Sequence, residues 1–255
     1  MPLREVRGCL IVPCFNEEHR WDDLYHQELL KIMSRCNIGV IYINDGSTDK
    51  TSQLIKGLKV SEHFEDLHLS SNQGKGNAIR MGLLHAVRSF PSAEFFGYVD
   101  SDGAFSLKDI SNACKYFMQT SDDVLIGARV QLAGSQVERT PIRHIVGRSI
   151  ATLLNVLILE TTIYDPQSGL KIIRKSDHFQ ESISNSFATK WFFDCELLLR
   201  MNAFGKHEIQ TREFALTSWK EVEAGHLKWH HGLHIIKELV SLLVIKLLLR
   251  KQFRN

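Results

Sequence analysis

The stretch Tyr98–Gly103, with the sequence YVDSDG, decides which fold and which chemistry the rest of the chain supports. Residues 94–99 form an apolar, aromatic run typical of a buried strand. Asp100 and Asp102 follow it, and in extended backbone their side chains share one face, about 6.6 Å apart. Two such carboxylates repel each other unless a cation lies near, and hard oxygen ligands suit Mg²⁺ or Mn²⁺. The stretch predicts a metal site for a nucleoside diphosphate; the alternative is an ordinary solvated turn.

The composition is that of a globular protein from a reducing compartment. The 255 residues are 44% hydrophobic and 24% charged, and the net charge of +2 gives no indication of nucleic-acid binding. The five cysteines lack CxxC spacing, so neither a disulfide framework nor a cysteine zinc site is expected. Residues 1–8 lack a signal-peptide core, and no uncharged apolar run reaches the roughly 20 residues that cross a bilayer. We expect a cytoplasmic protein without a nucleic-acid partner.

Strand, polar loop and helix follow one another repeatedly in the first hundred residues. The apolar runs predict strands at 8–13, 38–43, 67–69 and 94–99, separated by helices that end near residues 35, 59 and 88. This alternation predicts right-handed βαβ units in a mostly parallel sheet. Ligands of such sheets bind beyond the carboxyl ends of the strands. Three of the four loops there carry an acid, and the fourth carries Gly74–Lys75–Gly76.

The second half of the chain predicts further helices and strands but no linker, repeat or low-complexity tract. Helices are expected at 106–118, 141–159, 191–201 and from about 229 onward, and strands at 123–128, 170–173 and 207–214. Residues 131–139 are polar and aperiodic, which predicts a mobile loop over the site. We therefore expect a single domain, residues 1–255.

Seven stretches, in this order and at these separations, resemble a family 2 glycosyltransferase of the GT-A fold. They are IVPCFNEE (11–18), INDGSTDKT (43–51), NQGKGNAIRMG (72–82), YVDSDG (98–103), GAR (127–129), DPQSGLK (165–171) and WFFDCELL (191–198). The nearest subgroup makes dolichyl- or polyprenyl-phosphate glucose and mannose. The resemblance implies an α/β fold, a Rossmann-like, mostly parallel central sheet flanked by helices, followed by a C-terminal amphipathic helix at about 229–250. It also implies a nucleotide-sugar half at about 1–130 and an acceptor half at about 131–225.

The resemblance implies which residues bind the nucleotide sugar. The residues implied to bind the base and the ribose are Pro13, Asn16, Glu17 and Asp45. Lys75 lies in the loop that faces the nucleotide, and Ser101 lies between the two acids. Asp102 corresponds to the direct ligand of Mg²⁺ or Mn²⁺, with Asp100 nearer the ribose or sugar. Gly103–Ala104 stand where mannosyl relatives often carry Leu-Gln, which favours UDP-glucose over GDP-mannose as the donor.

A second set of residues is implied for catalysis and for the acceptor. Arg129 and Arg148 match basic positions that handle phosphates, and Asp194 matches the inverting base of many family members. The acceptor side is expected to comprise Arg143, Arg148, Asp165, Ser168 and Gly169. An alcohol acceptor requires a base. A lipid phosphate is largely ionised at neutral pH, so Asp194 would then orient or stabilise while Arg143 and Arg148 hold the phosphate.

Other functions compete with transfer to a polyprenyl phosphate. The same donor chemistry with a saccharide hydroxyl as acceptor is one alternative, and a non-catalytic nucleotide-sugar-binding scaffold is another. The retained acid pair and Asp194 count against the scaffold. A nucleotidyltransferase is disfavoured because its N-terminal Gly-rich Arg/Lys signature is absent.

The C-terminal segment carries two weaker signals. His226, His230 and His234 would align on a helix, which fits a zinc site less well than an exposed helix start. Glu196, beside Asp194, is either solvated or a partner in the site. Residues 233–249 are strongly apolar and precede a basic tail, so the helix packs on the core, on a partner subunit such as a second copy, or on a membrane surface.

Overall fold

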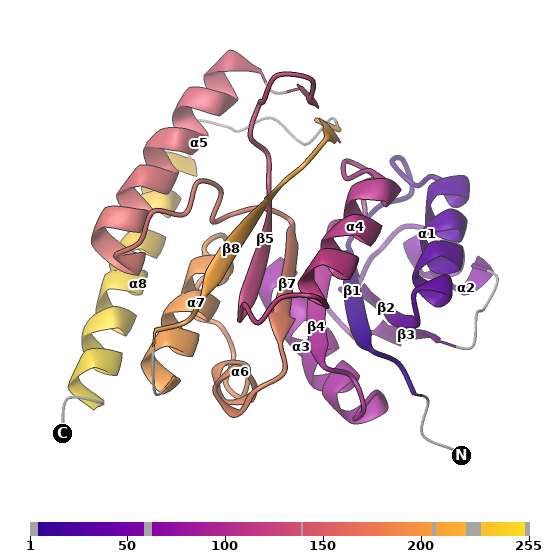
Figure 1. Ribbon diagram of the computed structural model, residues 1–255, viewed down its shortest axis with the longest axis horizontal. Helices are drawn as coiled ribbons and strands as arrows, with labels where there is room; N and C mark the ends of the chain where they lie inside the picture. The colour runs from indigo at the N-terminus through magenta and orange to yellow at the C-terminus, as the bar shows by residue number, and fades with distance from the viewer. Residues whose placement is uncertain (1–4, 59–62, 139, 206–207, 223–230, 253–255) are drawn as a thin grey trace.

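A seven-stranded, mostly parallel sheet forms the centre of the molecule (Figure 1). The computed structural model describes residues 5–58, 63–138, 140–205, 208–222 and 231–252. The sheet order is β3-β2-β1-β4-β7-β5-β8, and β7 runs antiparallel to both of its neighbours. The strands are β1 (Gly8–Cys14), β2 (Ile38–Asn44), β3 (Phe64–His68), β4 (Phe95–Val99), β5 (Val124–Ala128), β7 (Leu170–Arg174) and β8 (Thr211–Ala215). This is the expected α/β architecture, with β3 and β8 shifted by a few residues.

Helices cover both faces of the sheet, and every residue of the inner strands β1, β2 and β4 is therefore buried. One core cluster is covered by α1 (Asp23–Arg35), α2 (Thr51–Gly57) and α4 (Leu107–Phe117). The other is covered by α3 (Lys75–Ser89), α6 (Asp177–Ser182) and α7 (Phe193–Phe204). The side chains of Asp22 and Ser106 cap α1 and α4 by accepting backbone N–H groups of their first turns. These caps stand at the ends of polar loops, as the sequence pattern indicates.

In the second half one expectation is wrong in part and another is confirmed with a change of helix type. Residues 131–139 are not only a loop, since β6 (Gln136–Glu138) pairs in parallel with β9 (Ser218–Lys220), and Val137 is buried there. Three residues are too few for a periodic signal. The helix expected at 141–159 is α5 (Pro141–Leu154), which continues as the π-helical turn η1 (Asn155–Leu159). Glu160, with φ of 53°, ends that turn.

The C-terminal helix α8 (His231–Gln252) packs against α7 and η1 at one end of the molecule (Figure 1). Leu242 is buried, but so are the charged Glu238 and Lys246, whereas Ile236, Val240, Val244, Leu247 and Leu248 are exposed. The outward face is therefore apolar, the reverse of an ordinary surface helix. No helix within the described ranges is long and apolar enough to cross a membrane.

Candidate active site

A cavity of about 250 Å³ opens beyond the carboxyl ends of β1, β2 and β4. Its walls come from the loops after these strands and from the first turn of α3. The lining residues are Pro13, Cys14, Phe15, Glu17, Arg20, Asp45, Asn72, Lys75, Ala78, Asp100, Ser101 and Asp102. Parallel strands point their carboxyl ends at the same edge, so residues distant in sequence meet there. The cavity gathers seven of the eight side chains expected to bind the nucleotide sugar.

Asp100 and Asp102 both face this cavity and lie close to Lys75. Asp100 Oδ1 is 2.6 Å from Lys75 Nζ. Burial raises the pKa of Asp102, and the charge of Asp100 raises it further. Burial lowers the pKa of Lys75, but the attraction of Asp100, Asp194 and Asp102 outweighs it, and the pKa is raised. One ammonium thus faces two crowded carboxylates, an arrangement that favours an added cation.

Gly169 lies directly against Asp100. A Cβ built on Gly169 would stand 2.2 Å from Asp100 Oδ2, and the Gly169 carbonyl accepts the Asp100 backbone N–H at 3.1 Å. No side chain fits at this position. Gly169 therefore leaves room for the Asp100 carboxylate, which is a different contribution from the acceptor contact expected of it.

Asp45 and Asn16 hold loops together at the rim of the cavity. The Asp45 carboxylate accepts the backbone N–H groups of Gln73 and Gly74 at 2.8 and 2.9 Å, which fixes the loop before Lys75. Asn16 has φ of 51°, and its Oδ1 accepts the Thr48 N–H at 2.9 Å. Asn16 is not among the residues that line the cavity, and its side chain joins two loops.

Glu17 is buried beneath the acid pair. Its carboxylate lies 2.8 Å from Arg20 Nη2 and accepts the Ser101 hydroxyl at 3.1 Å. Burial raises the pKa of Glu17, and the charge of Arg20 opposes that rise. Glu17 thereby links the β1 loop to the loop that carries both aspartates. Pro13 lines the floor of the cavity at the end of β1.

Asp194, in the first turn of α7, lies in a buried polar network. Its Oδ1 accepts from Lys171 Nζ at 2.7 Å and from the Tyr98 hydroxyl. Lys171 and Tyr98 are fully buried, and the Lys171 ammonium also donates to the Ser168 carbonyl at 2.9 Å. An aspartate that accepts from an ammonium and a phenol at the same oxygen is held in one orientation.

Arg129 and Asp165 pair with each other. Arg129 Nε and Nη2 donate to the two oxygens of Asp165, both at 2.7 Å, and the guanidinium lies 5.3 Å from the Trp219 ring centre. Asp165 in turn receives the Arg129 backbone N–H, while its own N–H donates to Glu213 at 2.8 Å. A bidentate pair of this kind fixes the guanidinium plane. The structure thus brings together one residue expected for catalysis and one for the acceptor.

The remaining expected acceptor residues are placed differently. Ser168 is fully buried and its hydroxyl donates to the Gly127 carbonyl, so its side chain does not line an open surface. Arg148 donates to the Tyr164 carbonyl and lies 4.0 Å from the centre of that ring. The Arg143 side chain lies outside the described part of the structure, as do His226, His230 and the His234 side chain.

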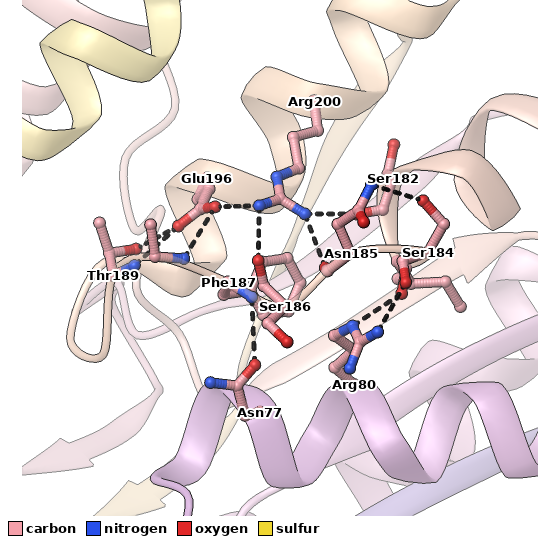
Figure 2. A network of polar contacts seen from close by, with 12 residues as sticks. Asn77, Arg80, Ser182, Ser184, Asn185, Ser186, Phe187, Thr189, Glu196 and Arg200 are labelled. Atoms are coloured by element: carbon pink, nitrogen blue, oxygen red, sulfur yellow. Dashed lines mark hydrogen bonds and ion pairs between the residues drawn. The ribbon is translucent and has the colours of Figure 1, made fainter.

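Glu196 is neither solvated nor part of the cavity. It is fully buried and accepts the Thr189 N–H and hydroxyl at 2.9 and 2.8 Å and the Ala188 N–H at 3.1 Å (Figure 2). Arg200 pairs with the same carboxylate at 2.5 Å. Glu196 therefore holds the segment before α7.

Sequence reasoning missed five residues of the cavity lining, which are Cys14, Phe15, Arg20, Asn72 and Ala78. It also missed the two partners of Asp194, Tyr98 and Lys171. They are direct partners in the antiparallel register of β4 and β7, which brings both side chains to Asp194. The sequence signal that could have identified Lys171 is its position inside an otherwise apolar strand segment, because a lysine is rarely buried unless it has a partner.

Comparison with known proteins gives the family. The profile described as Glycosyl transferase family 2 matches residues 9–179. The chain belongs to this family. It is 28% identical over 238 residues to dolichyl-phosphate beta-glucosyltransferase ALG5D of Trichomonas vaginalis, covering 88% of this chain and 69% of the relative. It is 26% identical over 265 residues to dolichyl-phosphate beta-glucosyltransferase of Saccharomyces cerevisiae, covering 95% and 75%.

Solved structures share the architecture at much lower identity. The glucosyl-3-phosphoglycerate synthase of Mycobacterium tuberculosis, crystallised with Mn²⁺, UDP and glucosyl-3-phosphoglycerate, has a TM-score of 0.63 at 13% identity, covering 94% of this chain and 80% of that one. A mannosyltransferase of Pyrobaculum calidifontis, in complex with GDP-Man and Mn²⁺, has a TM-score of 0.56 at 17% identity, covering 98% and 65%. The expected GT-A fold is confirmed.

Proposed function

We propose that this family 2 glycosyltransferase moves glucose from UDP-glucose to a polyprenyl phosphate of the dolichyl type, with inversion and with Mg²⁺ or Mn²⁺. The observation that carries the proposal is the cavity at the sheet edge, where Asp100, Asp102 and Lys75 face one another. The relatives whose names specify dolichyl-phosphate glucosyl transfer support the choice of sugar and acceptor. Under this proposal residues 1–130 serve the donor and 131–225 the acceptor.

The acid pair fits a hard divalent cation. Both carboxylates face the same cavity, and the raised pKa of Asp102 comes from burial and from the neighbouring charge of Asp100. In the described ranges no three His, Cys, Asp or Glu side chains converge as a complete metal site. A pair of carboxylates suits Mg²⁺ or Mn²⁺, which commonly complete their shell with water and phosphate oxygens. Asp102 would hold the ion with Asp100 beside it, and the bound ion would act as a Lewis acid toward the leaving diphosphate.

The chain's own residues supply the rest of the donor site. Lys75 presents an ammonium to the same cavity and would bind the diphosphate oxygens on which charge grows. Asp45 fixes the loop that carries Lys75, and Glu17 fixes Ser101 between the aspartates. Such fixed donors need little rearrangement as the bond to the sugar breaks.

The surroundings of Asp194 favour a phosphate acceptor over an alcohol. One of its oxygens already accepts from Lys171 and Tyr98, so proton abstraction at that oxygen would compete with an ion pair. A phosphate monoester, with its second pKa near about 6, arrives as a nucleophilic anion and needs no base. Asp194 would then orient Lys171 and stabilise the positive groups around the reacting phosphate. A saccharide hydroxyl acceptor would need a free base at this position.

An apolar surface formed by α5, η1 and α8 suits a lipid acceptor. Exposed side chains on α5 and η1 include Ile145, Val156 and Leu157, and α8 adds its outward apolar face. Arg250 and Lys251 lie in the last turn of α8. An apolar helix face with basic residues at its end binds the surface of a bilayer with anionic lipids. We include peripheral membrane contact through this surface in the proposal.

A product assay tests the proposal. The purified chain is incubated with dolichyl phosphate and, in turn, UDP-glucose, UDP-galactose, GDP-mannose and GDP-glucose, with Mn²⁺, Mg²⁺ or EDTA. The expected product is β-linked dolichyl-phosphate glucose from UDP-glucose with either metal and none with EDTA. Transfer to a saccharide alone, or no transfer and no thermal stabilisation by any donor, would contradict it. Donor at about 100 times its Kd should stabilise the fold by about 2.7 kcal/mol.

A further inference from the structure

Lys190 and Trp191 lie between the loop that carries Lys75 and the loop after η1. A Cβ built on Gly74 would be 3.9 Å from the Cγ and Cδ atoms of Lys190, so the lysine stem lies along the donor loop. The Trp191 carbonyl accepts from Gln167 Nε2 at 3.2 Å, which ties the same segment to the acceptor side. Both residues are exposed.

The other cations near the cavity are already engaged. The ion pairs there are Lys75 with Asp100, Arg129 with Asp165, Lys171 with Asp194 and Arg20 with Glu17. Arg148 is turned to the carbonyl and ring of Tyr164. Lys190 forms no ion pair with any residue in the described ranges, and the residue is exposed where its stem lies along the donor loop. Lys190 can therefore bind an incoming phosphate without first breaking an ion pair with a carboxylate.

Glu238, on α8, fixes the backbone of this segment. Its buried carboxylate accepts three successive N–H groups, those of Lys190, Trp191 and Phe192, at 3.0, 2.8 and 3.2 Å. The N-cap residue Phe192 gives α7 no side-chain cap of its own. Converging backbone N–H groups bind an anion strongly, and here the anion comes from a different helix. The position of Lys190 thus depends on the position of α8.

The segment is also fixed on its other side, before Lys190. Asn77, in the first turn of α3, accepts the Phe187 N–H at 3.1 Å, and Glu196 accepts the N–H groups of Ala188 and Thr189 (Figure 2). Backbone N–H groups on both sides of Lys190 are therefore bound by side chains of three helices. The backbone that carries Lys190 therefore needs little further ordering when the side chain binds a ligand.

We propose that Lys190 binds the phosphate of the acceptor and that Glu238 is the positioning residue that holds it there. The inference rests on the proposed transfer to a lipid phosphate and deepens it. The ammonium offers three hydrogen-bond donors to a phosphate that approaches between the donor loop and Gln167. Glu238 acts through the backbone of residues 190–192 and touches neither substrate. The same helix, α8, carries both Glu238 and the outward apolar face. Binding of α8 to a lipid surface is therefore linked to the position of Lys190.

Steady-state kinetics with detergent-dispersed dolichyl phosphate test the role of Lys190. Lys190→Met should raise KM for dolichyl phosphate about 10- to 100-fold while Kd for UDP and KM for UDP-glucose stay within about twofold. Lys190→Arg should restore most of the loss. Lys115→Met, at an exposed lysine on α4, is the matched control and should change neither constant. An unchanged acceptor KM in Lys190→Met, or a weakened Kd for UDP in its place, would overturn the assignment.

A double-variant comparison tests Glu238. Glu238→Gln should also raise KM for dolichyl phosphate, and the Lys190→Met/Glu238→Gln pair should be no worse than Lys190→Met alone, because both changes remove one contact. Independent, multiplicative effects would show that Glu238 supports only the fold. If Glu238→Gln melts early or loses its helical signal, Glu238→Asp replaces it in the same comparison. Failure of wild-type transfer to any phosphate acceptor would refute the proposed function, whereas active wild type with unaffected Lys190→Met refutes this inference alone.

Discussion

Two groups of acids at the carboxyl edge of the sheet have opposite surroundings. Asp100 and Asp102 face an open cavity, and the Lys75 ammonium pairs with Asp100. Asp194 and Glu196, in the first turn of α7, are buried. One oxygen of Asp194 accepts from Lys171 and Tyr98, and Glu196 accepts from Arg200, the Thr189 hydroxyl and backbone N–H groups. Both groups consist of two acids at i and i+2. The spacing alone therefore does not tell a ligand site from a structural network.

The difference lies in how completely the protein compensates each charge. A carboxylate with a full set of protein donors orders its neighbours and has little affinity left for a ligand. Crowded carboxylates with too few donors keep an unfavourable energy that a bound cation removes. We therefore assign ligand binding to the open pair and an organising role to the buried pair. Variants at each group should affect different properties.

The largest effect is expected at Asp102. Asp102→Asn should lower the rate of glucosyl transfer about 10³-fold, because it removes the carboxylate assigned to a metal worth several kcal/mol. The melting temperature without ligands should not fall, since the change also relieves repulsion with Asp100. Transfer rates and thermal melts with and without Mn²⁺ provide the measurement. If the variant keeps its transfer rate and its stabilisation by Mn²⁺, the assignment of ligand binding to Asp100 and Asp102 is wrong.

Asp194 should instead affect stability first. Asp194→Asn leaves the Lys171 ammonium buried without its anion, which costs about 3–5 kcal/mol of unfolding free energy. Chemical denaturation measures this cost, and Asp194→Leu combined with Lys171→Met should recover most of it. Loss of activity is expected to accompany the unfolding, with no change in Kd for Mn²⁺ in the folded fraction. A stable Asp194→Asn protein that lacks only catalysis would favour a free general base.

The smallest effect of the series is expected at Gly169, which lies against one of the open acids. Gly169→Ala places a Cβ 2.2 Å from Asp100 Oδ2, so the carboxylate must shift, at a cost of about 1–3 kcal/mol. Binding of Mn²⁺ with UDP should weaken more than the acceptor KM changes. Calorimetric titration of both ligands measures the difference. If only the acceptor KM rises, Gly169 belongs to the acceptor side as the sequence resemblance implies.

The sequence predicted which side chains meet at the cavity, because the signals there are local. Each apolar run, polar loop and helix lies within about 30 residues, and Asp45, Lys75, Asp100 and Asp102 meet because parallel strands end at one edge. The acceptor side depends on pairings that no local pattern encodes. Tyr98 meets Lys171 through the antiparallel register of β7, and Glu238 reaches Lys190 from 48 positions further along the chain. Burial of Ser168 and exposure of Trp191 follow from the same long-range packing.

The most direct test of the account is the position of a manganese ion bound together with UDP. Anomalous diffraction from crystals soaked with Mn²⁺ and UDP locates the ion and the diphosphate without reference to activity. We predict a peak at the Asp102 carboxylate, with Asp100 beside it and the diphosphate reaching toward Lys75. A peak at Asp194 or Glu196, or a diphosphate outside the cavity at the ends of β1, β2 and β4, would contradict the assignment of the open acid pair as the ligand site.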